Sequence, residues 1–166
     1  MRKKVPFSPF VYGGHQERNL RGGTESVPLI VGMGKAAESA RKHLPKYDKK
    51  VRPLRDALEE GILCSIPDTE LNGHKIQRLA NTTNITFRGI ESEALLILLD
   101  KEGICASSGS ACLADSDEPS HVIKAMKPES AASRQAVRFS LGDASTDSDI
   151  GKALSFLHQA TQTLRG

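Results

Sequence analysis

The first half of the chain shows hydrophobic residues at helical spacing. From Val27 to Ala40 the apolar residues recur every three or four positions, which predicts a helix. A second helical pattern covers residues 41–60, and we expect Pro45 and Pro53 to bend or interrupt it. Gly61 is expected to cap its end. Together the two patterns predict a long helical connection between two structural layers.

Beyond Gly61 the pattern changes to short apolar runs bounded by turn residues. Strands are expected at residues 62–66, 83–87, 104–106 and 135–141. Helices are expected at residues 92–101, from the cap residue Ser120 to residue 126, and from the capping segment 146–149 to about residue 164. This order predicts an α/β protein, specifically a small α+β domain with a mostly antiparallel sheet and helices on one face.

The N-terminal residues combine an extended pattern with a glycine-rich loop. Pro6 and Pro9 lie among apolar residues, which favours a strand or an extended connection over a helix. Residues 13–26 follow, with four glycines and interleaved charges, and Thr24 is placed to cap the next helix. A Gly-Gly-Thr sequence at a helix start is a candidate anion site, although an ordinary capped turn explains it equally well.

Composition excludes several classes of protein. The 166 residues carry a net charge of +3 with scattered basic side chains, so nothing indicates a nucleic-acid partner. No apolar run has the length needed to cross a membrane. The three cysteines are odd in number and irregular in spacing, which argues against a disulfide scaffold and fits a reducing cytoplasm.

Cys112 is the strongest candidate for chemistry. The sequence Gly103–Cys112 reads as a strand that leads into a small, hydroxylated loop ending on a thiol, which would leave the sulfur open to attack a substrate. A buried structural cysteine is the alternative of similar weight. A zinc site formed with Cys105 and His121 is disfavoured because no paired Cys-x-x-Cys spacing is present, and we assign no metal.

Four segments in order carry a resemblance to a known family. They are Gly13–Glu17 with Arg21–Glu25, Asn81–Phe87, Ser107–Cys112 with Glu118–Val122, and Val137–Gly142. With these segments the chain resembles the C-terminal portion of NifS/IscS-type cysteine desulfurases, which belong to the class-V aminotransferases. That resemblance implies a pyridoxal-phosphate-dependent fold-type-I transferase.

The resemblance also implies roles for single residues. Cys112 stands where the family has its catalytic cysteine, which takes sulfur from L-cysteine as a persulfide, gives L-alanine and passes the sulfur to an acceptor or iron–sulfur scaffold protein. Arg138 corresponds to the arginine that binds the substrate carboxylate; from its strand position alone, a surface arginine is the simpler interpretation. Thr24 corresponds to a threonine that contacts the cofactor phosphate in the partner subunit of the family dimer. His121 is interpreted as a helix-start residue.

The resemblance further divides the chain and shows what it lacks. We expect residues 1–34 to be an incomplete edge of the cofactor-binding domain, residues 35–60 a connecting helical segment, and residues 61–166 the C-terminal small domain. The family's cofactor lysine lies in a segment upstream of the matched motifs, and Lys75 does not correspond to it. The chain alone is therefore expected to be inactive and not to bind pyridoxal phosphate productively. The exposed apolar N-terminus predicts a homodimer or a complementary N-terminal half.

Two other interpretations stay open from the sequence. The chain could be a stand-alone, non-catalytic module that carries sulfur on Cys112 or binds an iron–sulfur scaffold. It could also be a degenerate remnant with structural content only, although the joint presence of Cys112, Arg138 and Thr24 speaks against that.

Overall fold

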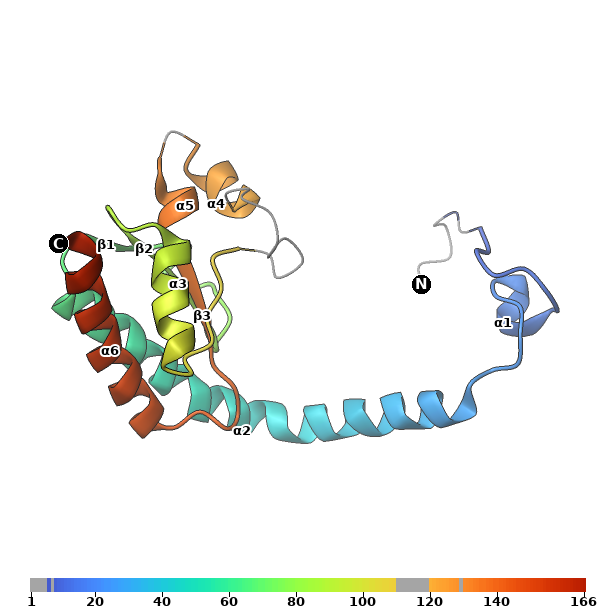
Figure 1. Ribbon diagram of the computed structural model, residues 1–166. Coiled ribbons are helices and arrows are strands. Elements are labelled where there is room, and N and C mark those ends of the chain that lie inside the picture. The colour runs from blue at the N-terminus through green and yellow to red at the C-terminus, as the bar shows by residue number, and fades with distance from the viewer. Residues whose placement is uncertain (1–5, 7, 110–119, 129) are drawn as a thin grey trace. The chain divides into compact units, whose positions relative to one another are not determined.

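A computed structural model describes residues 6, 8–109, 120–128 and 130–166. The chain divides into two compact units, Met1–Leu44 and Pro45–Gly166, and each is described by itself. Along the described chain (Figure 1), the elements are α1 Gln16–Asn19, α2 Val27–Ser65, β1 Thr69–Leu71, β2 Thr82–Phe87, α3 Ser92–Lys101, α4 His121–Met126, α5 Ala132–Gln135, β3 Ala136–Ser140 and α6 Asp147–Arg165.

Helix α2 is longer than the sequence pattern predicts. It continues through Pro45 and Pro53 and ends only at Ser65, so the strand expected at residues 62–66 and the cap expected at Gly61 are both wrong. The buried side chains Leu58, Ile62 and Ile66 follow a spacing of four, with exposed residues between them. A short apolar run does not distinguish a strand from a buried helix end, and packing on the core decided for the helix.

Several helix boundaries follow their predicted caps. The Ser120 hydroxyl accepts a hydrogen bond from the Ile123 backbone N–H at the start of α4. Thr146 and Asp149 form a reciprocal capping box at the start of α6. Thr24 does not cap α2 as predicted, because that helix begins at Val27 and its first turn includes a bond from Ile30 N–H to the Ser26 carbonyl.

The sheet is fully antiparallel, with the order β1–β2–β3. Confirmed predictions include the strands near residues 83–87 and 135–141, whereas β1 and the short α5 were not predicted. Since side chains alternate across a strand, Ile85 and Val137 point to one face, and Asn84 and Arg138 point to the other. The sheet thus has an apolar face and a polar face.

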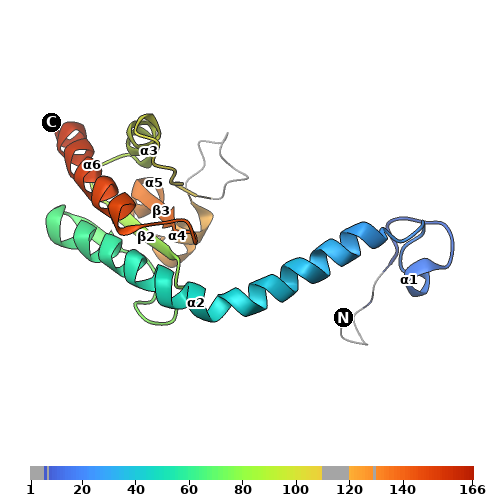
Figure 2. The same ribbon diagram turned by 90° about the horizontal axis from the view of Figure 1, so that it is seen from below.

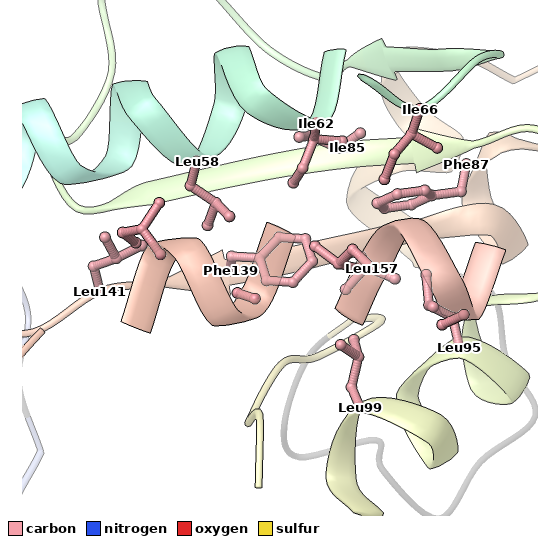
Figure 3. Close-up of a cluster of buried hydrophobic side chains, with 14 of the residues drawn as sticks. Leu58, Ile62, Ile66, Ile85, Phe87, Leu95, Leu99, Phe139, Leu141 and Leu157 are labelled. Atoms are coloured by element: carbon pink, nitrogen blue, oxygen red, sulfur yellow. The ribbon is translucent and has the colours of Figure 1, made fainter. Parts of the chain in front are cut away.

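The apolar face carries the main core of Pro45–Gly166. The C-terminal part of α2 runs alongside α6 (Figure 2), and residues from α2, α3 and α6 meet the side chains of β2 and β3 (Figure 3). Phe87, Leu95 and Leu157 are fully buried there. Each such side chain stabilises the fold by about 1.5–3 kcal/mol when it leaves water. The long helices therefore cover one face, and on the other Ile123 of α4 and Ala132 of α5 form a small cluster with Ala136 of β3.

Met1–Leu44 is built differently. Helix α1 is a single turn in which Glu17 and Arg18 have positive φ angles of 50° and 59°, so it belongs to the polar loop expected at residues 13–26. No strand forms in the described part of residues 1–12. Large apolar side chains stay exposed in this unit, among them Phe10, Tyr12, Leu29 and Met33. Along the described residues, none of the helices combines the length and the apolar character needed to cross a membrane.

Candidate functional site

Arg138 lies in the middle of β3, between two neighbouring segments. On one side it is the antiparallel partner of Asn84 in β2. On the other side it forms a bridge with Ser107: the Ser107 N–H donates to the Arg138 carbonyl oxygen at 3.1 Å, and the Arg138 N–H donates to the Ser107 carbonyl oxygen at 2.7 Å. The segment that leads toward Cys112 is therefore fastened to the strand that carries Arg138.

This bridge replaces the strand expected at residues 104–106. The Gly103 N–H donates to the Asp100 carbonyl and the Ile104 N–H to the Leu99 carbonyl, both at 2.9 Å. These bonds close the C-terminus of α3, with Gly103 at a positive φ of 72°. The backbone at residues 103–104 is thus used by the helix end, and pairing with β3 begins only at Ser107.

Arg138 lines a cavity of about 460 Å³ on the polar face of the sheet. The other lining residues come from β2, from the segment after β1, from residue 109 and from α4: Asn72, Asn84, Gly109, Ser120, His121, Val122, Ile123 and Met126. His121 is the first residue of α4, as predicted, and its side chain is exposed. The cavity thus has an apolar wall from α4 and a polar wall from the sheet.

Cys112 itself lies outside the described residues. The described positions on either side of its segment, Gly109 and Ser120, both line the cavity. They are close neighbours, since a Cβ atom placed on Gly109 would lie 4.0 Å from the Ser120 Cα atom. The Ser120 N–H also bonds the Ser133 carbonyl, which ties this end to α5. Both ends of the segment that contains Cys112 are therefore anchored beside Arg138.

A polar network that was not predicted from the sequence reaches the cavity wall through Asn72 and Asn84. Lys127 Nζ donates to Glu70 Oε1 at 2.6 Å and to Asn72 Oδ1 at 2.7 Å. Asn72 Nδ2 in turn donates to Asn84 Oδ1 at 2.7 Å and to Thr86 Oγ1 at 2.8 Å. The buried Asn72 therefore connects an ion pair to the strand residue opposite Arg138.

The carboxylate in this network is held in its charged form. Lys127 and then Arg88, which donates to Glu70 at 2.8 Å, lower the pKa of Glu70 below its usual range. Burial acts in the opposite direction and is outweighed. Glu70 is thus paired by two cations and does not cancel the charge of Arg138.

Thr24 is exposed and belongs to the other unit, Met1–Leu44. Just before Thr24, the backbone at Gly22 lies close to the backbone at Gly13. The Gly22 N–H donates to the Val11 carbonyl at 2.8 Å, and a Cβ atom on Gly22 would lie 2.6 Å from Gly13 N. The glycines at these positions thus allow two backbone segments to touch. The structure gives Thr24 a defined loop, and its contact with a cofactor phosphate stays a prediction.

The described lining of the Arg138 cavity contains no residue that could bind pyridoxal phosphate covalently. Among the described residues that line the cavity with Arg138, none is a lysine that could bind the cofactor covalently and none is acidic. Lys75 is exposed in the loop between β1 and β2 and does not line that cavity. What the described residues of Pro45–Gly166 offer is a cationic pocket beside the anchored ends of the Cys112 segment.

One weak signal in the sequence points to the residues of this polar network. In β2, Asn84 and Thr86 alternate with the apolar Ile85 and Phe87, which indicates a polar face opposite the core. Asn72 and Lys127 carry no such signal because they are far apart in the chain. Their contact exists only after β1 pairs with β2 and α4 packs on the polar face.

The sequence of this chain is similar to that of known proteins over nearly its whole length. Residues 3–152 match the family model described as "Aminotransferase class-V". The chain is 50% identical to cysteine desulfurase 2 of Trichormus variabilis over 165 residues, covering 99% of this chain and 41% of that protein. It is 47% identical to cysteine desulfurase IscS of Methanosarcina thermophila, with 99% and 41% covered.

Solved structures give the same result for the fold. A NifS-like protein from Rickettsia africae superposes with a TM-score of 0.80 at 29% identity, covering 95% of this chain and 41% of that one. Another NifS-like protein superposes with a TM-score of 0.81 at 30% identity, covering 98% and 41%. This chain spans about two fifths of the length of these relatives. Since the family model covers most of its residues, the chain belongs to the class-V aminotransferases.

Proposed function

We propose that this chain is the C-terminal part of a cysteine desulfurase. Cys112 accepts the sulfur atom of L-cysteine as a persulfide and passes it to an acceptor protein for the assembly of iron–sulfur clusters or other thio-cofactors. Arg138 binds the substrate carboxylate through its planar, bidentate guanidinium group. Thr24 contacts the phosphate of a cofactor bound by another subunit. The cysteine desulfurases that the chain resembles support this assignment.

The observation that carries the proposal is the shared position of Arg138 and the two ends of the Cys112 segment. Gly109 and Ser120 line the same cavity as Arg138. Cys112 follows Gly109 by three residues, so their Cα atoms are at most about 11 Å apart. We propose that the thiol, on a tether of this length, meets a substrate whose carboxylate is bound by Arg138 and then passes the sulfur to an acceptor.

The reaction balances without an external oxidant or reductant. The Cys112 thiol gains one sulfur atom and becomes a persulfide, and L-cysteine minus that atom is L-alanine. Pyridoxal phosphate, held by the remainder of the protein, supplies the electron sink for breaking the carbon–sulfur bond. This chain supplies the sulfur acceptor and the carboxylate site, and by itself it is inactive.

The exposed apolar residues of Met1–Leu44 support the proposal that another chain or segment covers this surface. Phe10 and Tyr12 are 94% and 82% exposed, and Leu29 is 74% exposed. Surfaces of this kind on soluble proteins mark association sites. We propose that they contact the cofactor-binding part of the protein and the partner subunit of a homodimer. The free thiols Cys64 and Cys105 agree with a reducing compartment such as the cytoplasm.

Reassembly with a complementary half tests the function. The half would be the part of the Trichormus variabilis relative that this chain does not cover, loaded with pyridoxal phosphate. We expect L-alanine and, with a thiol reductant, sulfide to form from L-cysteine only when both pieces are present. Cys112→Ser should abolish sulfide formation. The exposed thiols Cys64 and Cys105 are matched controls, and their serine variants should keep the activity.

The main alternative is a sulfur-carrier or scaffold-binding module without catalysis. The lack of a lysine among the described lining residues of the cavity favours it. In that case the reassembled pair would form no L-alanine, whereas a labelled persulfide donor would still transfer sulfur onto Cys112. That combination of results would contradict the desulfurase proposal.

A further inference from the structure

The polar network at the cavity wall fixes which way two side-chain amides point. Lys127 Nζ lies 2.7 Å from Asn72 Oδ1. An ammonium group donates hydrogen bonds and accepts none, so the Asn72 atom facing it must be the oxygen. The Asn72 nitrogen then faces Asn84 and Thr86, at 2.7 and 2.8 Å. Lys127 therefore sets the orientation of the buried Asn72 amide.

The same argument fixes the orientation of the Asn84 side-chain amide. Because the Asn72 nitrogen is a donor, the Asn84 atom that it contacts must be an acceptor, which is Oδ1. The backbone adds a second tie, since Asn72 N–H donates to the Asn84 carbonyl oxygen at 2.9 Å. In a planar amide the nitrogen lies opposite the oxygen, so the Asn84 NH₂ group points away from Asn72.

Asn84 and Arg138 stand side by side on the polar face of the sheet. They are antiparallel partners in β2 and β3, and such partners have Cβ atoms about 4.5–5.5 Å apart. Both line the same cavity. Within the described residues, neither the Asn84 nitrogen nor the Arg138 guanidinium has a side-chain or backbone acceptor at hydrogen-bond distance. This wall of the cavity therefore presents hydrogen-bond donors, which favour the binding of an anion.

We propose that the side-chain amide of Asn84 is a second donor to the carboxylate of the amino acid held by Arg138, and that Lys127 orients it through Asn72. Asn84 is thus a substrate-binding residue, and Asn72 and Lys127 are positioning residues. This inference rests on the proposed function, since it names a further residue for the same reaction. The ligand is the carboxylate of a small amino acid, which fits a guanidinium and a neutral donor beside the apolar Val122 and Met126.

Direct binding to the whole chain is the first test. The chain labelled with ¹⁵N would be titrated with L-alanine and monitored by NMR. We expect the Asn84 side-chain NH₂ signals and the Arg138 guanidinium signals to shift together with one saturation curve. Asn81 is the matched control because its amide nitrogen lies 3.4 Å from the Leu141 carbonyl and does not line the cavity, and its signals should stay in place. Shifts at Arg138 with none at Asn84 would overturn the proposal.

Kinetics of the reassembled enzyme are the second test. Asn84→Asp replaces the donor by a charged acceptor and should raise KM for L-cysteine about tenfold or more, with a much smaller change in kcat. Asn81→Asp should leave both constants unchanged. Lys127→Met should raise KM in the same way although Lys127 does not line the cavity, and Lys127→Arg should restore it. If Lys127→Met lowered both kcat and the melting temperature but left KM unchanged, the role of Lys127 would be structural only.

The two tests separate this inference from the proposed function. If the reassembled pair forms no L-alanine but the Asn84 signals shift, the carboxylate site stands and the desulfurase proposal fails. If L-alanine forms and Asn84→Asp leaves KM unchanged, the function stands and the role of Asn84 is overturned. The titration of the unmodified chain gives a result even if a variant does not fold.

Discussion

Glu59 on α2 and Arg78, in the loop before β2, form an ion pair with a nitrogen–oxygen distance of 2.8 Å and side chains that are 15% and 11% exposed. The hydroxyl of Thr83 on β2 donates to the same Glu59 oxygen at 2.6 Å. Glu59 therefore joins the helix under the core to the central strand. A mostly buried carboxylate of this kind tolerates loss of its charge poorly.

Glu59→Gln should lower the free energy of unfolding by about 2 kcal/mol, because it leaves the charge of Arg78 mostly buried without its partner. Urea unfolding followed by circular dichroism measures this change. Glu60→Gln is the control, since Glu60 is exposed on the same helix. Equal midpoints for the two variants would show that the pair contributes nothing measurable.

Gly61 and Leu154 provide a second test, at the contact between α2 and α6. A Cβ atom on Gly61 would lie 2.6 Å from Leu154 Cδ1. In an open helix position, alanine is more stable than glycine by about 1 kcal/mol. Here we expect Gly61→Ala to give little net change, because displacement of Leu154 offsets the gain in helix propensity.

Removing Leu154 should reveal that gain. In a Leu154→Ala background, Gly61→Ala should stabilise the protein by about 1 kcal/mol, so the two changes are not additive. Gly151→Ala on α6 is the control for propensity alone, since nothing lies within 4 Å of its Cβ position. Four urea curves complete the cycle. If the changes in the free energy of unfolding were strictly additive, Gly61 and Leu154 would not be in steric contact in a way that affects stability.

The second half of the fold was largely predictable from the sequence. The alternation of apolar and polar residues predicted the central strand, and apolar residues at helical spacing predicted α3 and α6. The hydroxyls of Ser120 and Thr146 predicted two helix starts. These signals are local, so each is visible within about ten residues. The end of α2 is different, because Ile62 belongs to the helix through packing against distant elements and not through a local pattern.

The candidate site was only partly predictable, for the same physical reason. Cys112 was a candidate from its small, hydroxylated loop alone, with a buried structural cysteine as the alternative. Arg138 was found through a resemblance, and it now has a defined cavity. Asn72, Asn84 and Lys127 were missed because their roles depend on contacts between residues 55 and 12 positions apart in the chain. No local pattern marks an asparagine whose amide is oriented by a remote lysine.

The charge on Glu70 predicts a pH dependence of stability. Lys127 first and Arg88 second lower its pKa in the folded state. A carboxylate with a lowered pKa stabilises the fold fully above about pH 4.5, its ordinary pKa, and this contribution is lost as the pH falls through the folded value. Unfolding midpoints of the wild type and Glu70→Gln should therefore differ at pH 7 and converge in acid. A difference that grows toward pH 3 would contradict this sign.

The bridge between Ser107 and Arg138 gives the last prediction, on the link between the sheet and the Cys112 segment. Ser107→Pro removes the N–H that donates to the Arg138 carbonyl oxygen at 3.1 Å, and Ser107→Ala keeps it. We expect the proline variant to keep the core, because Ser107 is not part of it. The Arg138 amide, which donates to the Ser107 carbonyl oxygen, should exchange with deuterium at least tenfold faster, and the Val137 and Phe139 amides should change little.

The same variant should affect sulfur transfer more than stability. Under the proposed function, loss of this anchor should misplace the thiol relative to the substrate, so the reassembled pair should form the proposed persulfide more slowly by about tenfold or more. Ser107→Ala should retain normal rates, which separates the backbone bond from the side-chain contact between Ser107 Oγ and the Gly109 carbonyl oxygen at 3.1 Å. If Ser107→Ala were as slow as Ser107→Pro, the hydroxyl rather than the bridge would hold the segment at Arg138.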